Sequence, residues 1–251
     1  MGGIYDDETL DDLLIQGLKL IQKKKGFRFT LDSVLLGHFA TVKEGDRAVD
    51  LGTGTGVIPF ILSTRVKTLH IIGLEIQSEM AEMAARSVRL NDLEEVIEIR
   101  QGDVREVHRK IGGGVYTLVL SNPPYWTLKE GKPSPENAKA LARHEVACDF
   151  EDVVAGAGKL LNYQGRFAFI HRAERLPDLF ALLRSYELEP RRIRMIHPFL
   201  DRPARHVLVE AKKSAPAGLA VLPPLIVYEQ KGQYTQEILA WYGRTQDVCG
   251  S

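Results

Sequence analysis

From residue 47 onward, short apolar runs alternate with longer stretches whose apolar residues recur at helical spacing. The short runs are rich in Val, Ile and Leu or alternate apolar with polar residues, which predicts strands at 47–52, 69–76, 96–103, 115–124, 165–172, 191–198 and 204–213. The longer stretches predict helices that begin at 57 and cover 77–91, 150–161 and 176–186. Strands that alternate with helices predict an α/β fold with a mostly parallel sheet and right-handed crossovers.

The segment before this alternating part has a different character. From Leu18 to Leu36 it reads as a basic, turn-containing stretch followed by a helix whose N-cap is Thr30 or Asp32. Its lysines, taken alone, indicate a hairpin exposed to solvent. We therefore expect an N-terminal extension over 1–45, made of a hairpin and a helix, that packs on a domain over 46–251.

The C-terminal part of the chain is less regular. Residues 214–224 have little periodicity and are interpreted as a linker within the domain. A short strand is expected at 225–229 and a helix at 235–242.

Composition and charge exclude several classes of protein without identifying a partner. The chain has 251 residues, of which 44% are hydrophobic and 26% charged, which fits one large domain with small extensions. Lys+Arg and Asp+Glu both number 33, so a nucleic-acid binder would need a local basic surface. Cys148 and Cys249 form no CxxC pair, so no metal site is expected. The acidic start resembles no signal peptide and no apolar run reaches about 20 residues, so we expect a cytoplasmic protein.

A glycine-rich turn follows the first predicted strand. Asp50 is followed by glycines at 52, 54 and 56, which leave the backbone open to a ligand and permit left-handed dihedral angles. The next strand ends near Glu75, whose carboxylate can accept both hydroxyl groups of a ribose. A dinucleotide turn would need glycine at position 57, where this chain has Val57, so the turn departs from the dinucleotide motif.

The fourth predicted strand ends in Ser121, followed by Asn122-Pro123-Pro124-Tyr125. An exocyclic or amide nitrogen is a poor nucleophile because its lone pair is delocalised. The side-chain oxygen of Asn122 and the carbonyl of Pro123 can accept its two N–H groups, and the prolines stiffen the turn that holds them. Tyr125 offers a face on which a flipped-out base can stack, which contributes about 1–3 kcal/mol per base.

These motifs together resemble the S-adenosyl-L-methionine-dependent amino-methyltransferases that act on adenine, cytosine or glutamine amide nitrogen. The segments 26–36 (GFRFTLDSVLL) and 142–145 (ARHE) are more narrowly similar to the bacterial tRNA1(Val) adenine-N6 methyltransferase family. The resemblance runs from about residue 10 to 245. It implies a Rossmann-like class I methyltransferase fold with a seven-stranded sheet and helices on both faces, and S-adenosyl-L-methionine as cofactor.

The resemblance also assigns cofactor contacts. Asp50 and the three glycines would hold the methionine end, and the stretch from Phe29 to Asp32 would close over it. Glu75 with Ile76 would contact the ribose side, while Asp103 with Val104 would contact the cofactor adenine. The cofactor-binding residues expected are therefore Phe29, Asp32, Asp50, Gly52, Gly54, Gly56, Glu75, Ile76, Asp103, Val104 and Asn122.

Substrate contacts are expected from three places. Catalysis is assigned to Asn122, Pro123 and Tyr125, and no metal is involved. The base pocket would be lined by Pro124, Tyr125, Trp126, Arg143 and His144, next to a mobile loop over 126–143. Arg192, Arg194 and Arg205 belong to a local excess of basic residues that either follows RNA phosphates or is a solvated strand edge.

The sequence thus predicts adenine-N6 methylation of RNA, with tRNA the expected substrate, by a monomer or weak dimer. A protein glutamine-amide methyltransferase remains open, although few residues precede the sheet to form a substrate domain. A DNA adenine or small-molecule methyltransferase and a non-catalytic nucleic-acid-binding module also remain open.

Overall fold

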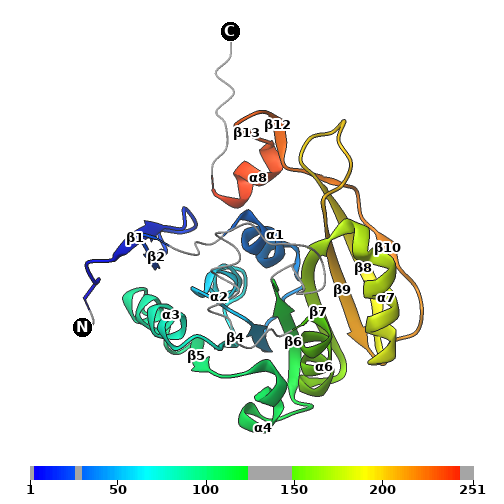
Figure 1. Ribbon diagram of the computed structural model, residues 1–251, viewed down its shortest axis with the longest axis horizontal. Coiled ribbons are helices and arrows are strands. Elements are labelled where there is room, and N and C mark those ends of the chain that lie inside the picture. The colour runs from blue at the N-terminus through cyan, green and yellow to red at the C-terminus, as the bar shows by residue number, and fades with distance from the viewer. Residues whose placement is uncertain (1–2, 26–29, 124–148, 244–251) are drawn as a thin grey trace.

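The computed structural model describes residues 3–25, 30–123 and 149–243, and its centre is one twisted sheet (Figure 1). Seven strands of five or more residues form it: β3 (Asp46–Leu51), β4 (Leu69–Glu75), β5 (Ile97–Gln101), β6 (Tyr116–Ser121), β7 (Leu161–Arg172), β8 (Leu188–His197) and β9 (His206–Lys213). They lie in the order β8-β9-β7-β6-β3-β4-β5. Among the seven, β9 runs antiparallel to both its neighbours and the other pairs are parallel. This confirms the predicted mostly parallel α/β fold.

Helices cover both faces of the sheet (Figure 1). One face packs against α1 (Leu31–Phe39), α2 (Val57–Ser63), α3 (Ser78–Leu90) and α8 (Gln236–Trp241). The other packs against α4 (Val107–Ile111), α6 (Phe150–Leu160) and α7 (Leu176–Ser185). Short 3-10 turns, η1 (Val104–Glu106) and η2 (Ala173–Arg175), precede α4 and α7. The sequence predicted neither η1 nor α4, because eight residues are too few to show a helical period.

Two apolar cores result, one on each face of the sheet. Successive strand residues point to opposite faces, so Leu118 packs with the α1 and α2 side while Val119 packs with the α6 and α7 side. Ala168 and Phe167 divide in the same way on β7. Strands buried on both faces explain the near-continuous apolar runs in the sequence.

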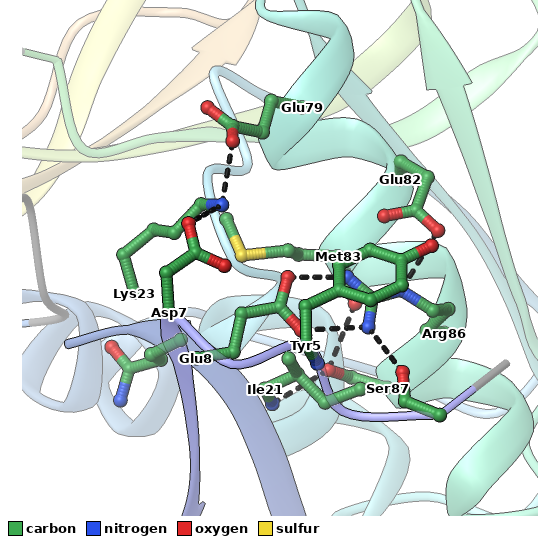
Figure 2. A network of polar contacts seen from close by, with 12 residues as sticks. Tyr5, Asp7, Glu8, Ile21, Lys23, Glu79, Glu82, Met83, Arg86 and Ser87 are labelled. Carbon is green, nitrogen blue, oxygen red and sulfur yellow. Dashed lines mark hydrogen bonds and ion pairs between the residues drawn. The ribbon is translucent and has the colours of Figure 1, made fainter.

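An N-terminal hairpin of β1 (Glu8–Asp12) and β2 (Lys19–Lys23) packs on α3. Figure 2 shows the contact, at whose centre both guanidinium Nη atoms of Arg86 donate to the Glu8 carboxylate at 2.8 and 2.6 Å. Both side chains are buried, and the Tyr5 ring lies 4.3 Å from the Arg86 guanidinium. The amide of Ile21 also donates to Ser87 of α3 at 2.9 Å. The predicted hairpin is thus attached to the domain by a buried ion pair.

Helix α1 connects the start of the chain with its end. Thr30 is its N-cap, as predicted, although its side chain makes no capping hydrogen bond. Near the other end of the helix, the His38 ring stacks on Trp241 of α8 with centroids 4.9 Å apart. Burial lowers the pKa of His38 to about 4, so this ring is neutral at physiological pH.

The C-terminal part differs from its sequence-based interpretation. The predicted linker contains β10 (Ala220–Val221), which pairs with β8. The predicted single strand at 225–229 is two strands: β11 (Leu225–Ile226) also pairs with β8, whereas β12 (Tyr228–Gln230) forms a separate hairpin with β13 (Gln233–Tyr234). The main sheet therefore has nine strands when these two-residue additions are counted. Segments this short carry no readable period, which is why the prediction was wrong here.

Candidate active site

The glycine-rich turn lies at the carboxyl end of β3, where strand order reverses between β4 and β6. Gly52, Gly54 and Gly56 have φ angles of +76°, +57° and +89°, so each occupies the left-handed region that favours glycine. The amide groups of Gly52 and Thr53 both donate to the Leu74 carbonyl of β4 at 2.9 Å. The turn is therefore fixed at the crevice where open α/β sheets bind ligands.

Asp50 is a buried carboxylate beneath this turn. Its side chain is 0% exposed, and neither carboxylate oxygen has a hydrogen-bond partner among the residues that the structure describes. Burial raises the pKa of Asp50 to about 7, because the nearby Thr53 side chain only partly offsets it and the Glu75 carboxylate adds to the rise. A buried acid with so little hydrogen bonding from the described residues is costly, which points to a ligand that carries a cation or donates hydrogen bonds.

Glu75 lies at the carboxyl end of β4 beside the turn. Its two carboxylate oxygens accept from the amides of Gly54 and Gln77, at 2.9 and 3.0 Å. These bonds orient the carboxylate and leave each oxygen a further lone pair for a hydroxyl group. The next residue, Ile76, is 38% exposed, an apolar surface that fits a nucleoside. The ribose contacts predicted for these two residues remain a prediction.

Asp103 follows β5 and caps η1, but its carboxylate is already engaged. It accepts from the Arg105 amide at 2.9 Å and from the Arg105 Nε at 3.0 Å, and these hydrogen bonds lower the pKa of Asp103. The sequence had not indicated this partner. Val104 is buried in the core, so only its backbone is a candidate contact for an adenine.

Asn122 follows β6 directly and faces the glycine turn. Ser121 Oγ donates to the Leu51 carbonyl at 2.8 Å, which joins the carboxyl ends of β6 and β3. Asn122 Nδ2 donates to Ser33 Oγ of α1 at 3.0 Å. One pocket is lined by Ser33, Gly52, Thr53, Gly54, Thr55, Val57, Ile58 and Asn122. The fold thus brings the two motifs into one site, as predicted, and adds Ser33, which the sequence analysis missed.

We predict that Ser33→Ala lowers kcat roughly 2- to 10-fold, because one net hydrogen bond of about 0.5–1.5 kcal/mol no longer orients the Asn122 amide. Ser33→Thr retains the hydroxyl group and is expected to retain most of the activity. Steady-state kinetics measures kcat. Cofactor titration and thermal unfolding serve as controls, because a residue that only positions Asn122 should change neither the cofactor affinity nor the unfolding temperature. An unchanged kcat for Ser33→Ala would contradict it.

Several predicted site residues lie outside the described part of the chain. These are Phe29, Pro124, Tyr125, Trp126, Arg143 and His144, together with the loop predicted at 126–143. Asp32 is described and lies in the first turn of α1, one residue before Ser33. Pro123 is described and buried directly after Asn122.

The arginines predicted to follow RNA phosphates have other partners. Arg192 donates to the Phe39 carbonyl of α1 at 2.6 Å and pairs with Glu210 at 3.2 Å. Arg194 pairs with Glu237 of α8 at 2.6 Å. Their side chains are only 28% and 17% exposed, so they hold helices on the sheet and do not form an exposed phosphate-binding surface. Arg205 is exposed in the turn before β9.

The residues present fit S-adenosyl-L-methionine. No group of three or more His, Cys, Asp or Glu side chains arranged for a metal occurs within 3–25, 30–123 and 149–243. No helix of these ranges is long and apolar enough to cross a membrane. The buried Asp50 carboxylate, the open glycine turn and the oriented Glu75 suit a cation, a backbone contact and a ribose, respectively.

Comparison with known proteins agrees with this geometry. The family model of the methyltransferase small domain matches residues 31–174. A tRNA1(Val) (adenine(37)-N6)-methyltransferase of Porphyromonas gingivalis is 29% identical over 221 residues, covering 84% of this chain and 85% of the relative. One of the same name from Aeromonas salmonicida is 30% identical over 158 residues, covering 62% and 64%.

Solved structures share the fold. A predicted O-methyltransferase of Agrobacterium tumefaciens superposes with a TM-score of 0.68 at 24% identity, covering 84% of this chain and 95% of that one. Geranyl diphosphate C-methyltransferase of Streptomyces coelicolor, solved with S-adenosyl-L-homocysteine, superposes with a TM-score of 0.52 at 14% identity. The match covers 73% of this chain and 78% of that one.

Proposed function

Because the chain belongs to the methyltransferase small domain family, we propose that it transfers a methyl group from S-adenosyl-L-methionine to the exocyclic N6 of an adenine in tRNA. The relatives from Porphyromonas gingivalis and Aeromonas salmonicida carry that activity in their names, which supports the substrate class. The proposal includes a cytoplasmic location and a monomer or weak dimer.

One observation supports the chemistry most directly: Asn122 lines the same pocket as the glycine turn. A group that polarises an amine must lie where the methyl donor is held, because transfer requires the reacting atoms to approach in line at about 3–3.5 Å. Ser121 and Leu51 join the two strand ends that carry these motifs. A nitrogen-directed methyltransferase accounts for both motifs in one pocket.

When bound, S-adenosyl-L-methionine supplies a methyl group on a positively charged sulfur. Asp50 would attract the cationic methionine end from beneath the glycine turn. Glu75 would accept hydrogen bonds from the ribose hydroxyl groups. Ile76 would cover one face of the adenosine. The burial of Asp50 excludes water, so its charge acts on the ligand with little screening.

The chain's residues then act on the acceptor amine. Asn122 Oδ1 accepts one N–H and the Pro123 carbonyl accepts the other, which localises the nitrogen lone pair for attack. The hydrogen bond from Asn122 Nδ2 to Ser33 Oγ fixes the orientation of the amide, so that Oδ1 lies on the opposite side of the amide from Nδ2. These acceptors are in place before the reaction, so no reorganisation is needed in the transition state.

Asp50→Asn is predicted to weaken cofactor binding and to stabilise the protein. The pKa of Asp50 is about 7 in the folded state, above its ordinary value, so its charge destabilises the fold as pH rises through 7. Removing that charge should raise the free energy of unfolding at pH 8 by roughly 1–4 kcal/mol. Urea unfolding and calorimetric titration with S-adenosyl-L-homocysteine measure the two effects.

The pH dependence tests the same residue. Protonation of Asp50 below pH 7 removes the partner of the cationic end, so wild-type affinity for S-adenosyl-L-homocysteine should fall by up to about tenfold per pH unit. In Asp50→Asn the affinity should be low and nearly independent of pH over this range. Equal pH profiles for the two proteins would exclude Asp50 as the group that holds the cation.

The proposed activity is tested by transfer of radiolabelled methyl from S-adenosyl-L-methionine to unmodified total tRNA, with duplex DNA and a protein extract in parallel. N6-methyladenosine in hydrolysed tRNA is the expected product. Label in protein would instead indicate glutamine-amide methylation, and label in duplex DNA a DNA adenine methyltransferase. Either result, without label in tRNA, overturns the proposal.

A further inference from the structure

The turn between β8 and β9, residues 198–205, lies at the same edge of the sheet as the candidate site. Since β8 and β7 both run antiparallel to β9, β8 points in the direction of β7, β6 and β3. Its carboxyl end at His197 therefore lies at the edge where Asn122 and the glycine turn are. Three inter-strand spacings of about 4.8 Å separate β8 from β6, and β8 extends beyond the level of Ser121, so the turn lies more than roughly 14 Å from the site.

The backbone of this turn is held from both sides. The Arg202 amide donates to the Phe199 carbonyl at 3.1 Å, and the Arg205 amide donates to the Ile196 carbonyl at 2.9 Å. The His197 ring contacts the Arg202 carbonyl at 2.7 Å, and the Phe199 ring packs on Tyr228 of β12 with centroids 5.7 Å apart. The turn thus needs little ordering when a partner binds.

Its side chains point into solvent despite the fixed backbone. Leu200 is 81% exposed, more than any other large apolar residue that the structure describes, and the Arg202 side chain is 66% exposed. Arg205 is exposed as well. The ion pair of Arg202 with Asp201 spans 3.9 Å between two exposed groups and therefore contributes little in water.

Resting on the proposed function, we propose that Arg202 and Arg205 bind phosphates of the RNA strand next to the methylated adenine, with Leu200 packing on the exposed ribose or base. Guanidinium groups match phosphate geometry and stay charged at every physiological pH. A phosphate-binding surface must be exposed. This turn meets that condition, whereas the guanidinium groups of Arg192 and Arg194 form ion pairs with Glu210 and Glu237 and are largely covered. In a chain of zero net charge, such a local pair of cations is what the RNA would recognise.

The test compares two double variants of the full chain. Arg202→Ala/Arg205→Ala removes the two charges of the turn. Arg109→Ala/Arg184→Ala removes two charges elsewhere, since Arg109 lies in α4 and Arg184 in the last turn of α7, with side chains 71% and 58% exposed. Binding of a fluorescent, unmodified tRNA transcript is measured by anisotropy over a range of salt concentrations. Methyl transfer to the same transcript and affinity for S-adenosyl-L-homocysteine are measured in parallel.

The turn variant should bind tRNA roughly tenfold more weakly, and the slope of log Kd against log salt should fall by about 2, one per lost phosphate contact. Its cofactor affinity should be unchanged, and the control variant should resemble wild type. An unchanged slope in the turn variant, or an equal loss in the control, overturns the assignment of this surface while wild-type methylation of tRNA still upholds the proposed function. If wild type neither binds nor methylates tRNA but labels protein, the function and this surface both fail.

Discussion

Asn122→Ala is expected to lower kcat for methyl transfer by roughly 10²–10³-fold, the usual cost of removing one preorganised polar group from a reaction centre. The variant loses the Oδ1 acceptor that localises the lone pair of the amine, and Ser33 loses its partner at 3.0 Å. The fold should be unaffected, because Asn122 lies outside β6 at the pocket. Single-turnover kinetics with saturating tRNA and S-adenosyl-L-methionine measure the chemical step apart from binding.

Two comparisons make this prediction specific. Asn122→Asp keeps an oxygen acceptor in place and should retain more activity than Asn122→Ala, although it cannot donate to Ser33. Titration with S-adenosyl-L-homocysteine should show that both variants bind the cofactor product nearly as wild type does. Full activity in Asn122→Ala would show that another group polarises the amine.

Arg86→Ala should be the most destabilising substitution at the N-terminal hairpin, lowering the free energy of unfolding by about 3–5 kcal/mol. The guanidinium and the Glu8 carboxylate are 2% and 1% exposed, so removal of one leaves the other charged and buried. The ring of Tyr5 and the carbonyl of Gly3 lose a contact as well. Urea unfolding followed by circular dichroism measures the change.

The matched control is Arg109→Ala, which removes an exposed ion pair with Glu106 and should cost less than about 1 kcal/mol. Replacing both Glu8 and Arg86 with leucine should cost far less than Arg86→Ala, because no uncompensated charge remains. A loss below 1 kcal/mol in Arg86→Ala would mean that the hairpin detaches locally, and proteolysis within 3–25 would then separate it from the domain.

The same pair predicts how acid affects the hairpin. Hydrogen bonds from Arg86 lower the pKa of Glu8, so its contribution to stability is present above the ordinary glutamate pKa of about 4.3 and is lost as pH falls through the folded value. Wild type should therefore lose more stability than a Glu8→Leu/Arg86→Leu variant between about pH 5 and pH 3, where a glutamate of ordinary pKa gains its proton.

Local sequence patterns were enough to predict the main strands and two parts of the site, the glycine turn and Asn122. Strands buried on both faces leave long apolar runs, so β3 to β9 could be located from the sequence. The glycine turn and the stretch after Ser121 could be placed together because parallel strands end at one edge of the sheet.

What could not be predicted depends on partners far apart in the chain. The bond between Ser33 and Asn122 joins residues 89 positions apart, and no spacing rule indicates it. Arg192 and Arg194 alternate on a strand, which is equally typical of an exposed edge and of a face covered by helices. Only the position of α1 and α8 on that face decides between the two.

Because helix α1 carries Ser33 and is held in place by residues far along the chain, the site forms in a particular order during protein synthesis. The first turn of α1 carries Ser33, yet the helix is held on the sheet by Arg192 and by Trp241, which leave the ribosome long after residues 31–122. A nascent chain can therefore form the glycine turn and Asn122 before it can fix Ser33. The methyl-transfer site is thus completed by residues that are translated well after it and lie outside it.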